Sequence, residues 1–267
     1  MPELPEVRTV AKLLKNKLLK QKIVSIEVLY PKTIVSESLD ISLLINQTLL
    51  DIKTQGKYLI FIFDDYDMVS HLRMEGKYFI KALDEQIVKH EHVIFNFEKL
   101  SLRYHDTRKF GRMQVINKGD LLKVSGLNKL APEPFMITKE VLFEKLKKKN
   151  TQVKSLLLDQ TIISGLGNIY VDEVLFACGI SPLRLGKNIT LEECQKIIDA
   201  GIQILNASIE VGGTTIFSYT AVGETGHYQG HLLVHTKAGN PCVNCSTLIK
   251  KIKVGGRGTY YCEHCQK

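Results

Sequence analysis

The chain lacks a long apolar segment. None of its 267 residues belongs to an uninterrupted apolar run of 18, which argues against a membrane-spanning helix. Lys and Glu interrupt the N-terminal residues every few positions, and no small-residue cleavage site follows them, so we expect no signal peptide. Internal repeats and low-complexity tracts are also missing. We therefore expect a globular protein in the cytoplasm, with no membrane partner.

Positive charge exceeds negative charge along the chain. The formal net charge is +8 and the isoelectric point is about 9.0. Such an excess favours an acidic partner, of which nucleic acid is the usual one. A basic protein with no polyanionic partner has the same composition, so charge alone separates the two classes poorly.

The spacing of apolar residues changes along the chain. Residues 3–19 carry one apolar stripe at helical spacing, which predicts an amphipathic helix. Short β-rich runs separated by turn residues then predict an antiparallel sandwich or barrel. After the break at 131–134 the pattern is helical, and the fold class is therefore α+β. The expected strands are 23–28, 48–54, 58–63, 68–72, 92–97, 102–104 and 113–116, and the expected helices begin after Thr138 and cover 154–158, 168–177 and 191–211.

The first residues, Met1-Pro2-Glu3-Leu4-Pro5-Glu6, combine prolines with two acids. If Met1 is removed, Pro2 becomes a terminal amine that titrates near ~8, against ~10.4 for lysine. Such an amine can attack an electrophilic carbon and form an iminium. However, proline is also favoured at the first position of a helix, where acids complement the helix dipole. The hexapeptide alone favours this structural interpretation.

Four of the six cysteines form two pairs near the C-terminus. Cys242 and Cys245 are followed, after 16 residues, by Cys262 and Cys265. This spacing predicts one structural Zn2+ ion held by four thiolates, with no open position for a catalytic water. Two disulfides are the alternative, but thiols stay reduced in the cytosol. Because about thirty residues bury little apolar surface, metal binding would supply their folding energy.

A basic, glycine-rich turn separates the two cysteine pairs. Residues 237–267 hold six Lys or Arg and one Glu, and the turn itself reads Gly255-Gly256-Arg257-Gly258. Glycines around one arginine suit a close approach to a phosphate backbone. A solvated basic turn is the alternative, and the zinc hairpin on a basic chain favours nucleic acid.

These motifs together resemble one family. An N-terminal Pro-Glu-Leu-Pro-Glu-Val, a central Gly-Leu-Gly-Asn-Ile-Tyr and a four-cysteine finger holding Gly-Arg-Gly-Thr are similar to bacterial formamidopyrimidine-DNA glycosylase, an 8-oxoguanine glycosylase and AP lyase. The resemblance covers residues 2 to 265 in the same motif order. It implies a monomeric repair enzyme that binds double-stranded DNA containing an oxidised base or an abasic site.

The resemblance also implies catalytic roles. Pro2 resembles the nucleophile that attacks C1′ of the damaged nucleotide, Glu3 the acid that assists sugar opening, and Glu6 a support of that first turn. Lys57 matches the lysine assigned to β-elimination, and Arg257 the finger arginine assigned to δ-elimination. Zinc would be structural.

Further residues match the family's DNA contacts. A base in a duplex must be extruded before its C1′ is reached, and side chains fill the gap that it leaves. Met74, Arg108 and Phe110 match these fillers, although Phe110 alone would more often be a core residue and Met74, at a turn between Arg73 and Glu75, is explained equally well by the core. His90, Arg108 and Lys154 match DNA-contact positions, Asn168 lies in the helix–two-turn–helix motif, and residues 218–228 resemble a lid over the extruded base.

The resemblance implies four segments. They are an N-terminal helix and β-sandwich catalytic domain at 2–131, a helical helix–two-turn–helix DNA-binding domain at 132–217, a lesion-recognition loop and connector at 218–236, and a zinc finger at 237–267.

Two alternative functions remain at this stage. An endonuclease VIII-like enzyme would use the same amine on oxidised pyrimidines, although that family typically has glycine where this chain has Leu4. A non-catalytic zinc protein that binds DNA would not need a terminal Pro-Glu. The sequence ranks neither the oxidised purines nor the opposite bases.

Overall fold

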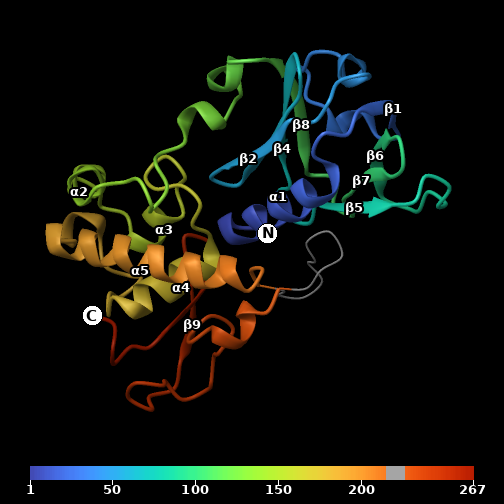
Figure 1. The fold of residues 1–267 in the computed structure, drawn as a ribbon. Coiled ribbons are helices and arrows are strands. Elements are labelled where there is room, and N and C mark those ends of the chain that lie inside the picture. The colour runs from blue at the N-terminus through green and yellow to red at the C-terminus, as the bar shows by residue number, and fades with distance from the viewer. Residues whose placement is uncertain (215–225) are drawn as a thin grey trace. The chain divides into compact units, whose positions relative to one another are not determined.

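The computed structural model describes residues 1–214 and 226–267 (Figure 1). The chain divides into two compact units. The first comprises Met1–Asn128 and Gly212–His227, and the second comprises Lys129–Val211 and Tyr228–Lys267. Most of the predicted lid at 218–228 lies outside the described residues, and the division into four segments stays a prediction.

Within its described residues, the first unit has one α-helix and two antiparallel sheets of four strands each. One sheet has the order β1-β6-β7-β5 and the other β2-β3-β4-β8 (Figure 1). This arrangement confirms the predicted antiparallel β domain. The elements are α1 (Leu4–Leu18), β1 (Ile23–Val28), β2 (Asp51–Gln55), β3 (Tyr58–Ile62), β4 (Tyr66–His71), β5 (Lys77–Lys81), β6 (Glu91–Phe97), β7 (Ser101–His105) and β8 (Arg112–Asn117).

The apolar stripe of α1 belongs to the core of this unit. Val10, Leu14 and Leu18 are fully buried and join one cluster with aromatic residues from both sheets, such as Phe61 and Phe95. The helix packs against β2 and β3. Burying a leucine-sized side chain contributes roughly 1.5–3 kcal/mol, so the stripe fixes α1 on the sheets and thereby places its N-terminus.

The second unit consists of four helices and a two-stranded hairpin. Threonines cap two of the helices: Thr138 Oγ1 accepts the Val141 N–H, and Thr190 forms a capping box with Glu193. Gly212 and Gly213 follow the last helix at φ +81° and +82°, which only glycine adopts readily. The elements are α2 (Lys139–Leu146), α3 (Val153–Leu157), α4 (Asn168–Ala177), α5 (Leu191–Glu210), β9 (Lys250–Val254) and β10 (Arg257–Tyr261).

Short 3-10 helices connect several of these elements, at Pro31–Thr33, Ile41–Leu44, Asp120–Lys123, Leu127–Lys129, Gly186–Asn188 and Tyr228–His231. Among the described residues, no helix combines the length and the apolar character that crossing a bilayer requires.

A buried ion pair connects β6 and β7. Arg103 Nη1 donates to Glu91 Oε2 at 3.1 Å, and both side chains are at most 2% exposed. The guanidinium also donates to the Ser101 hydroxyl and to the backbone carbonyls of Gln86 and Glu85. The ion pair therefore ties the β5–β6 connection to the sheet.

We expect Glu91→Gln to lower the free energy of unfolding by about 3–5 kcal/mol, because it leaves a buried guanidinium without its counter-charge. Glu85→Gln is the matched control. It removes a carboxylate that is 47% exposed from its bond to Lys81, a pair that solvent screens, and should lower the free energy of unfolding far less. Urea unfolding followed by circular dichroism measures both, and equal losses would contradict this account.

Candidate active site

The start of α1 is held by two acidic side chains. Glu3 is the N-cap residue, and its side chain accepts the backbone N–H of Glu6. In return, Glu6 Oε2 accepts the Glu3 N–H at 2.9 Å. Both carboxylates are at most 3% exposed. This reciprocal capping box fixes the peptide immediately after Pro2.

The second oxygen of Glu6 holds a distant segment of the same unit. Glu6 Oε1 accepts the backbone N–H of Thr214 at 2.8 Å and its hydroxyl at 3.0 Å. A Cβ at Gly213 would lie only 2.8 Å from this oxygen, so the approach requires glycine. Glu6 therefore joins the helix start to the last described residue before position 215.

Lys57 lies in the turn between β2 and β3. Its side chain is 5% exposed, and it follows Gly56, whose φ is +54°. Lys57 and Arg73 both place positive charge near His71. Burial first, and then these two cations, lower the pKa of His71 to about 3. The imidazole is therefore neutral at pH 7.

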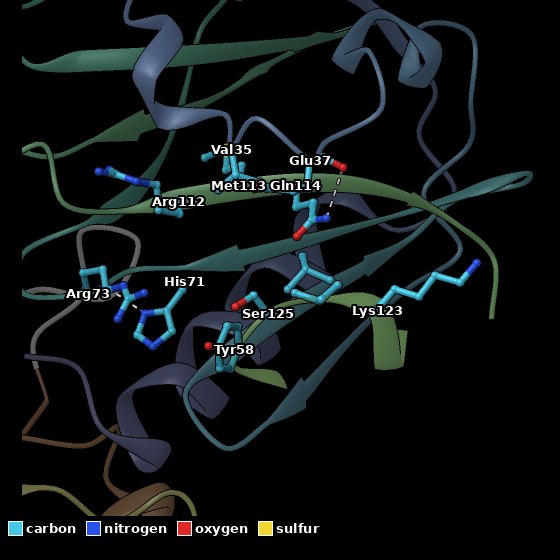
Figure 2. A pocket seen from close by; sticks show the side chains of 12 residues that line it. Val35, Glu37, Tyr58, His71, Arg73, Arg112, Met113, Gln114, Lys123 and Ser125 are labelled. Atoms are coloured by element: carbon cyan, nitrogen blue, oxygen red, sulfur yellow. Dashed lines mark hydrogen bonds between the residues drawn. The ribbon is translucent and has the colours of Figure 1, made fainter. Parts of the chain in front are cut away.

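The tautomer of His71 follows from its hydrogen bond. Nδ1 accepts the backbone N–H of Arg73 at 3.0 Å, so the ring proton is on Nε2 (Figure 2). His71 and Tyr58, whose rings meet edge to face, line a pocket of about 340 Å³. Three cations, Arg73, Arg112 and Lys123, also line this pocket, with Glu37 as the one acid in its lining. The excess of positive charge in this lining suits a phosphate group.

Asp106 organises the loop that carries Arg108 and Phe110. Its Oδ1 accepts the Arg108 N–H at 2.9 Å, and its Oδ2 accepts the N–H groups of Phe110 and Gly111 at 2.9 and 2.8 Å. The carboxylate is fully buried, whereas Phe110 is 47% exposed. The Arg108 guanidinium lies 4.9 Å from the Phe110 ring centre. The loop is thus fixed beneath an exposed arginine–aromatic pair.

The turn that carries Met74 is joined to this loop. Thr107 Oγ1 donates to Glu75 Oε2 at 2.9 Å, directly beside Met74. Met74 is partly buried, and the preceding Arg73 has φ +55°. His90 contacts the same loop, because its carbonyl accepts the Asp106 N–H at 3.0 Å. The structure therefore brings together four residues predicted to contact DNA, Met74, His90, Arg108 and Phe110.

The remaining predicted residues belong to the second unit. Asn168 begins α4, and its Nδ2 donates to the Gly258 carbonyl at 3.0 Å. Lys154 is fully buried, and its Nζ donates to Asp172 Oδ1 at 2.6 Å and to the same Gly258 carbonyl at 3.0 Å. Arg257, next to Gly258, is exposed at the start of β10. These three predicted residues therefore meet at the hairpin.

The four clustered cysteines have the geometry of a tetrahedral zinc site. All four sulfurs lie within 4.8 Å of one another. The Cys242–Cys265 and Cys245–Cys262 sulfur pairs are 3.9 and 3.4 Å apart, against about 3.8 Å across a tetrahedron with Zn–S bonds of about 2.3 Å. Hydrogen bonds from Thr247 lower the pKa of Cys245 to about 6 and favour its thiolate, whereas the neighbouring Cys245 thiol raises the pKa of Cys265.

Three residues of these sites were not identified from the sequence. Asp106, Asp172 and Glu173 are buried acids that organise loops in the structure. Glu173, for example, accepts the N–H groups of Leu233, Val234 and His235. The available signal is the adjacent pair Asp172-Glu173 within an apolar helix, and it does not reveal the partners of these acids.

Three domain models match the chain in order. They are described as the formamidopyrimidine-DNA glycosylase N-terminal domain (residues 1–113), the formamidopyrimidine-DNA glycosylase H2TH domain (130–220) and a zinc finger found in FPG and IleRS (239–267). This combination defines a DNA glycosylase with a zinc finger. The chain belongs to the formamidopyrimidine-DNA glycosylase family.

Individual relatives agree with this assignment. Formamidopyrimidine-DNA glycosylase of Ligilactobacillus salivarius is 47% identical over 274 residues, covering 100% of this chain and 99% of the relative. Two structures of the Lactococcus lactis protein match with TM-scores of 0.94 at 40% identity, each covering 100% of both chains. One is a variant in complex with DNA containing Fapy-dG, and the other is a complex with DNA containing an abasic site.

We expect the purified protein to contain one zinc per chain, and Cys262→Ala to lose it because three thiolates no longer close the tetrahedron. Cys178→Ala is the matched control, since Cys178 lies outside the cluster. Elemental analysis measures both variants. Full zinc content in the Cys262 variant would contradict the assignment.

The depressed pKa of His71 predicts a pH-dependent stability. The unfolded chain protonates this imidazole near ~6.5, but the folded chain protonates it only near 3. Between these values the unfolded state binds more protons, so the free energy of unfolding should fall by up to ~1.4 kcal/mol per pH unit on acidification. Urea unfolding at pH 7 and pH 5 measures this loss, which should be smaller in His71→Gln. An NMR titration midpoint near 6.5 for His71 would contradict the prediction.

Proposed function

We propose that this protein is a bifunctional DNA glycosylase and AP lyase that acts as a monomer on duplex DNA containing oxidised purines. Its nucleophile would be the Pro2 nitrogen, freed when Met1 is removed. The observation that carries this proposal is the capping box of Glu3 and Glu6, which holds the peptide after Pro2 in one conformation. Met1 is 47% exposed and thus open to removal.

The proposed reaction begins at C1′ of the damaged nucleotide. The Pro2 nitrogen forms a bond to C1′ as the bond from C1′ to the base breaks, and the proton lost from the Pro2 nitrogen passes to the base, which leaves in neutral form. Glu3 donates a proton to the ring oxygen O4′, the ring opens, and an iminium joins C1′ to the protein. Glu6 supports this geometry through the first turn of α1.

Two eliminations follow from the iminium. Loss of a proton from C2′ breaks the C3′–O bond and releases the 3′ phosphate, a step assigned to Lys57. Loss of a further proton breaks the C5′–O bond and releases the 5′ phosphate, a step assigned to Arg257. Hydrolysis of the iminium then frees Pro2 and leaves a one-nucleotide gap.

The exposed loop residues support extrusion of the damaged nucleotide. Unstacking a base costs a few kcal/mol, and apolar or stacking side chains can replace it in the duplex. Phe110 beside Arg108, and Met74 on the adjoining turn, provide such groups on loops fixed by Asp106 and Glu75.

Phosphate contacts are proposed for His90, Asn168 and Arg257, and the buried Lys154 would support them through its hydrogen bond to the Gly258 carbonyl. The neutral His71 would add a hydrogen bond from Nε2 without adding charge. Each phosphate that a cation neutralises should lower log K by about 0.9 per unit of log salt. The structural zinc stabilises the finger and takes no part in the chemistry.

We expect Pro2→Gly to give about tenfold less borohydride-trapped adduct with 8-oxoguanine duplex, because a primary amine replaces the constrained secondary amine. Pro5→Ala is the matched control: it changes the other proline of the same turn and should trap normally. Gel electrophoresis of the adduct measures both. Trapping of both variants at the wild-type level would contradict the proposed nucleophile, and faster excision of thymine glycol than of 8-oxoguanine would favour the endonuclease VIII-like alternative.

A further inference from the structure

A buried carboxylate connects α4 to the hairpin of the second unit. Asp172 is 1% exposed, and both of its oxygens are hydrogen-bonded. Oδ1 accepts from Lys154 Nζ at 2.6 Å, whereas Oδ2 contacts His235 Nδ1 at 2.8 Å and accepts the Tyr260 N–H at 3.2 Å. Asp172 therefore contacts α3, β10 and the segment before the zinc finger.

The carbonyl of Gly258 is the second point of attachment. It accepts one hydrogen bond from Lys154 and another from Asn168, each at 3.0 Å. Gly258 directly follows Arg257 on β10. Two donors from two different helices thus fix the peptide between Gly258 and Thr259, one residue beyond Arg257.

The tip of the hairpin is also closely packed. Gly255 has φ +54°, and a Cβ there would lie 2.5 Å from Ser155 Oγ on α3. Arg257 itself is exposed. The backbone on both sides of this arginine therefore contacts α3 and α4, while its side chain is exposed.

The buried ammonium of Lys154 requires the negative charge of Asp172. Lys154 has no exposed surface, and a buried ammonium is tolerated only with a counter-charge and well-formed hydrogen bonds. If Asp172 became neutral, Lys154 would move toward water and leave the Gly258 carbonyl. In an Asp172→Asn variant, the amide N–H group would also point at a group that now donates a hydrogen bond to Asp172.

We propose that Asp172 is a positioning residue for Arg257, acting through Lys154 and the Gly258 carbonyl. Asp172 thereby positions Arg257 to contact the sugar–phosphate backbone of DNA. In this proposal Lys154 has a structural role, because it connects Asp172 to the Gly258 carbonyl. The inference rests on the proposed role of Arg257 in the second elimination.

The experiment measures the ratio of δ- to β-elimination products on abasic duplex DNA under single-turnover conditions. We expect Asp172→Asn to lower this ratio by about tenfold, the scale of one lost charge-assisted hydrogen bond. Borohydride trapping should stay within about twofold of wild type, since the iminium forms at Pro2. The product ratio does not depend on how much protein is folded, so a purely structural defect would leave it unchanged.

A double-mutant cycle shows whether Asp172 acts through Arg257. Asp172→Asn should have no further effect on the product ratio, or on affinity for abasic-site duplex, in an Arg257→Ala background. Effects that add in full would overturn the proposal. Glu193→Gln is the control. It removes an ion pair with Arg184 in the same unit, at 2.6 Å, and should leave the ratio unchanged.

A second variant covers the case in which Asp172→Asn does not fold. Asp172→Glu keeps the charge that Lys154 requires but is one methylene longer in a packed site, so it should lower the ratio by about threefold. A wild-type ratio in whichever variant folds with one zinc per chain would overturn the inference. Failure of wild-type protein to trap DNA would instead contradict the proposed function.

Discussion

The rest of the account depends on the carboxylate of Glu6. One oxygen closes the capping box at the start of α1, and the other holds Thr214, which is 208 residues away in the sequence. Charge-assisted bonds to backbone N–H groups are about twice as strong as neutral ones, and a helix N-terminus favours an anion. A single side chain thus fixes both the peptide beside Pro2 and the start of the segment that follows Gly213.

The same device recurs at the other predicted contacts. Asp106 accepts backbone N–H groups beneath Phe110, and Asp172 holds β10 next to Arg257. In both cases a buried acid accepts a backbone N–H near the exposed residue that is predicted to meet DNA. The loop beneath Phe110 needs such a partner because its N–H groups have no neighbouring strand. Buried carboxylates therefore fix the backbone beside the residues that are predicted to contact DNA.

Much of the fold could be predicted from the sequence. The stripe on α1, the Thr138 cap and the cysteine spacing each correspond to a local pattern, and the structure confirms all three. Strand β5 was missed because its sequence begins and ends with lysine and follows a turn, so its alternation is short. Hydrogen bonding to β7 stabilises this strand, although its local sequence is a weak strand signal.

The candidate site was less accessible to sequence reasoning. Motifs indicated which residues carry the chemistry, since a terminal proline or a paired cysteine is identifiable by its neighbours. Asp172 and Glu173 were not identifiable, because the groups that they bind lie far away in the chain. Asp172, for instance, meets Tyr260 across 88 residues. Such contacts depend on the packed fold and leave no spacing pattern.

The most direct test is to locate the covalent bond in the trapped protein–DNA adduct. The adduct formed on 8-oxoguanine duplex would be digested with protease and nuclease, and the modified peptide sequenced by mass spectrometry. The account predicts a peptide that begins at Pro2, without Met1, with the reduced sugar on the proline nitrogen. A sugar attached to Lys57 or any other lysine, or an adduct that retains Met1, would contradict it.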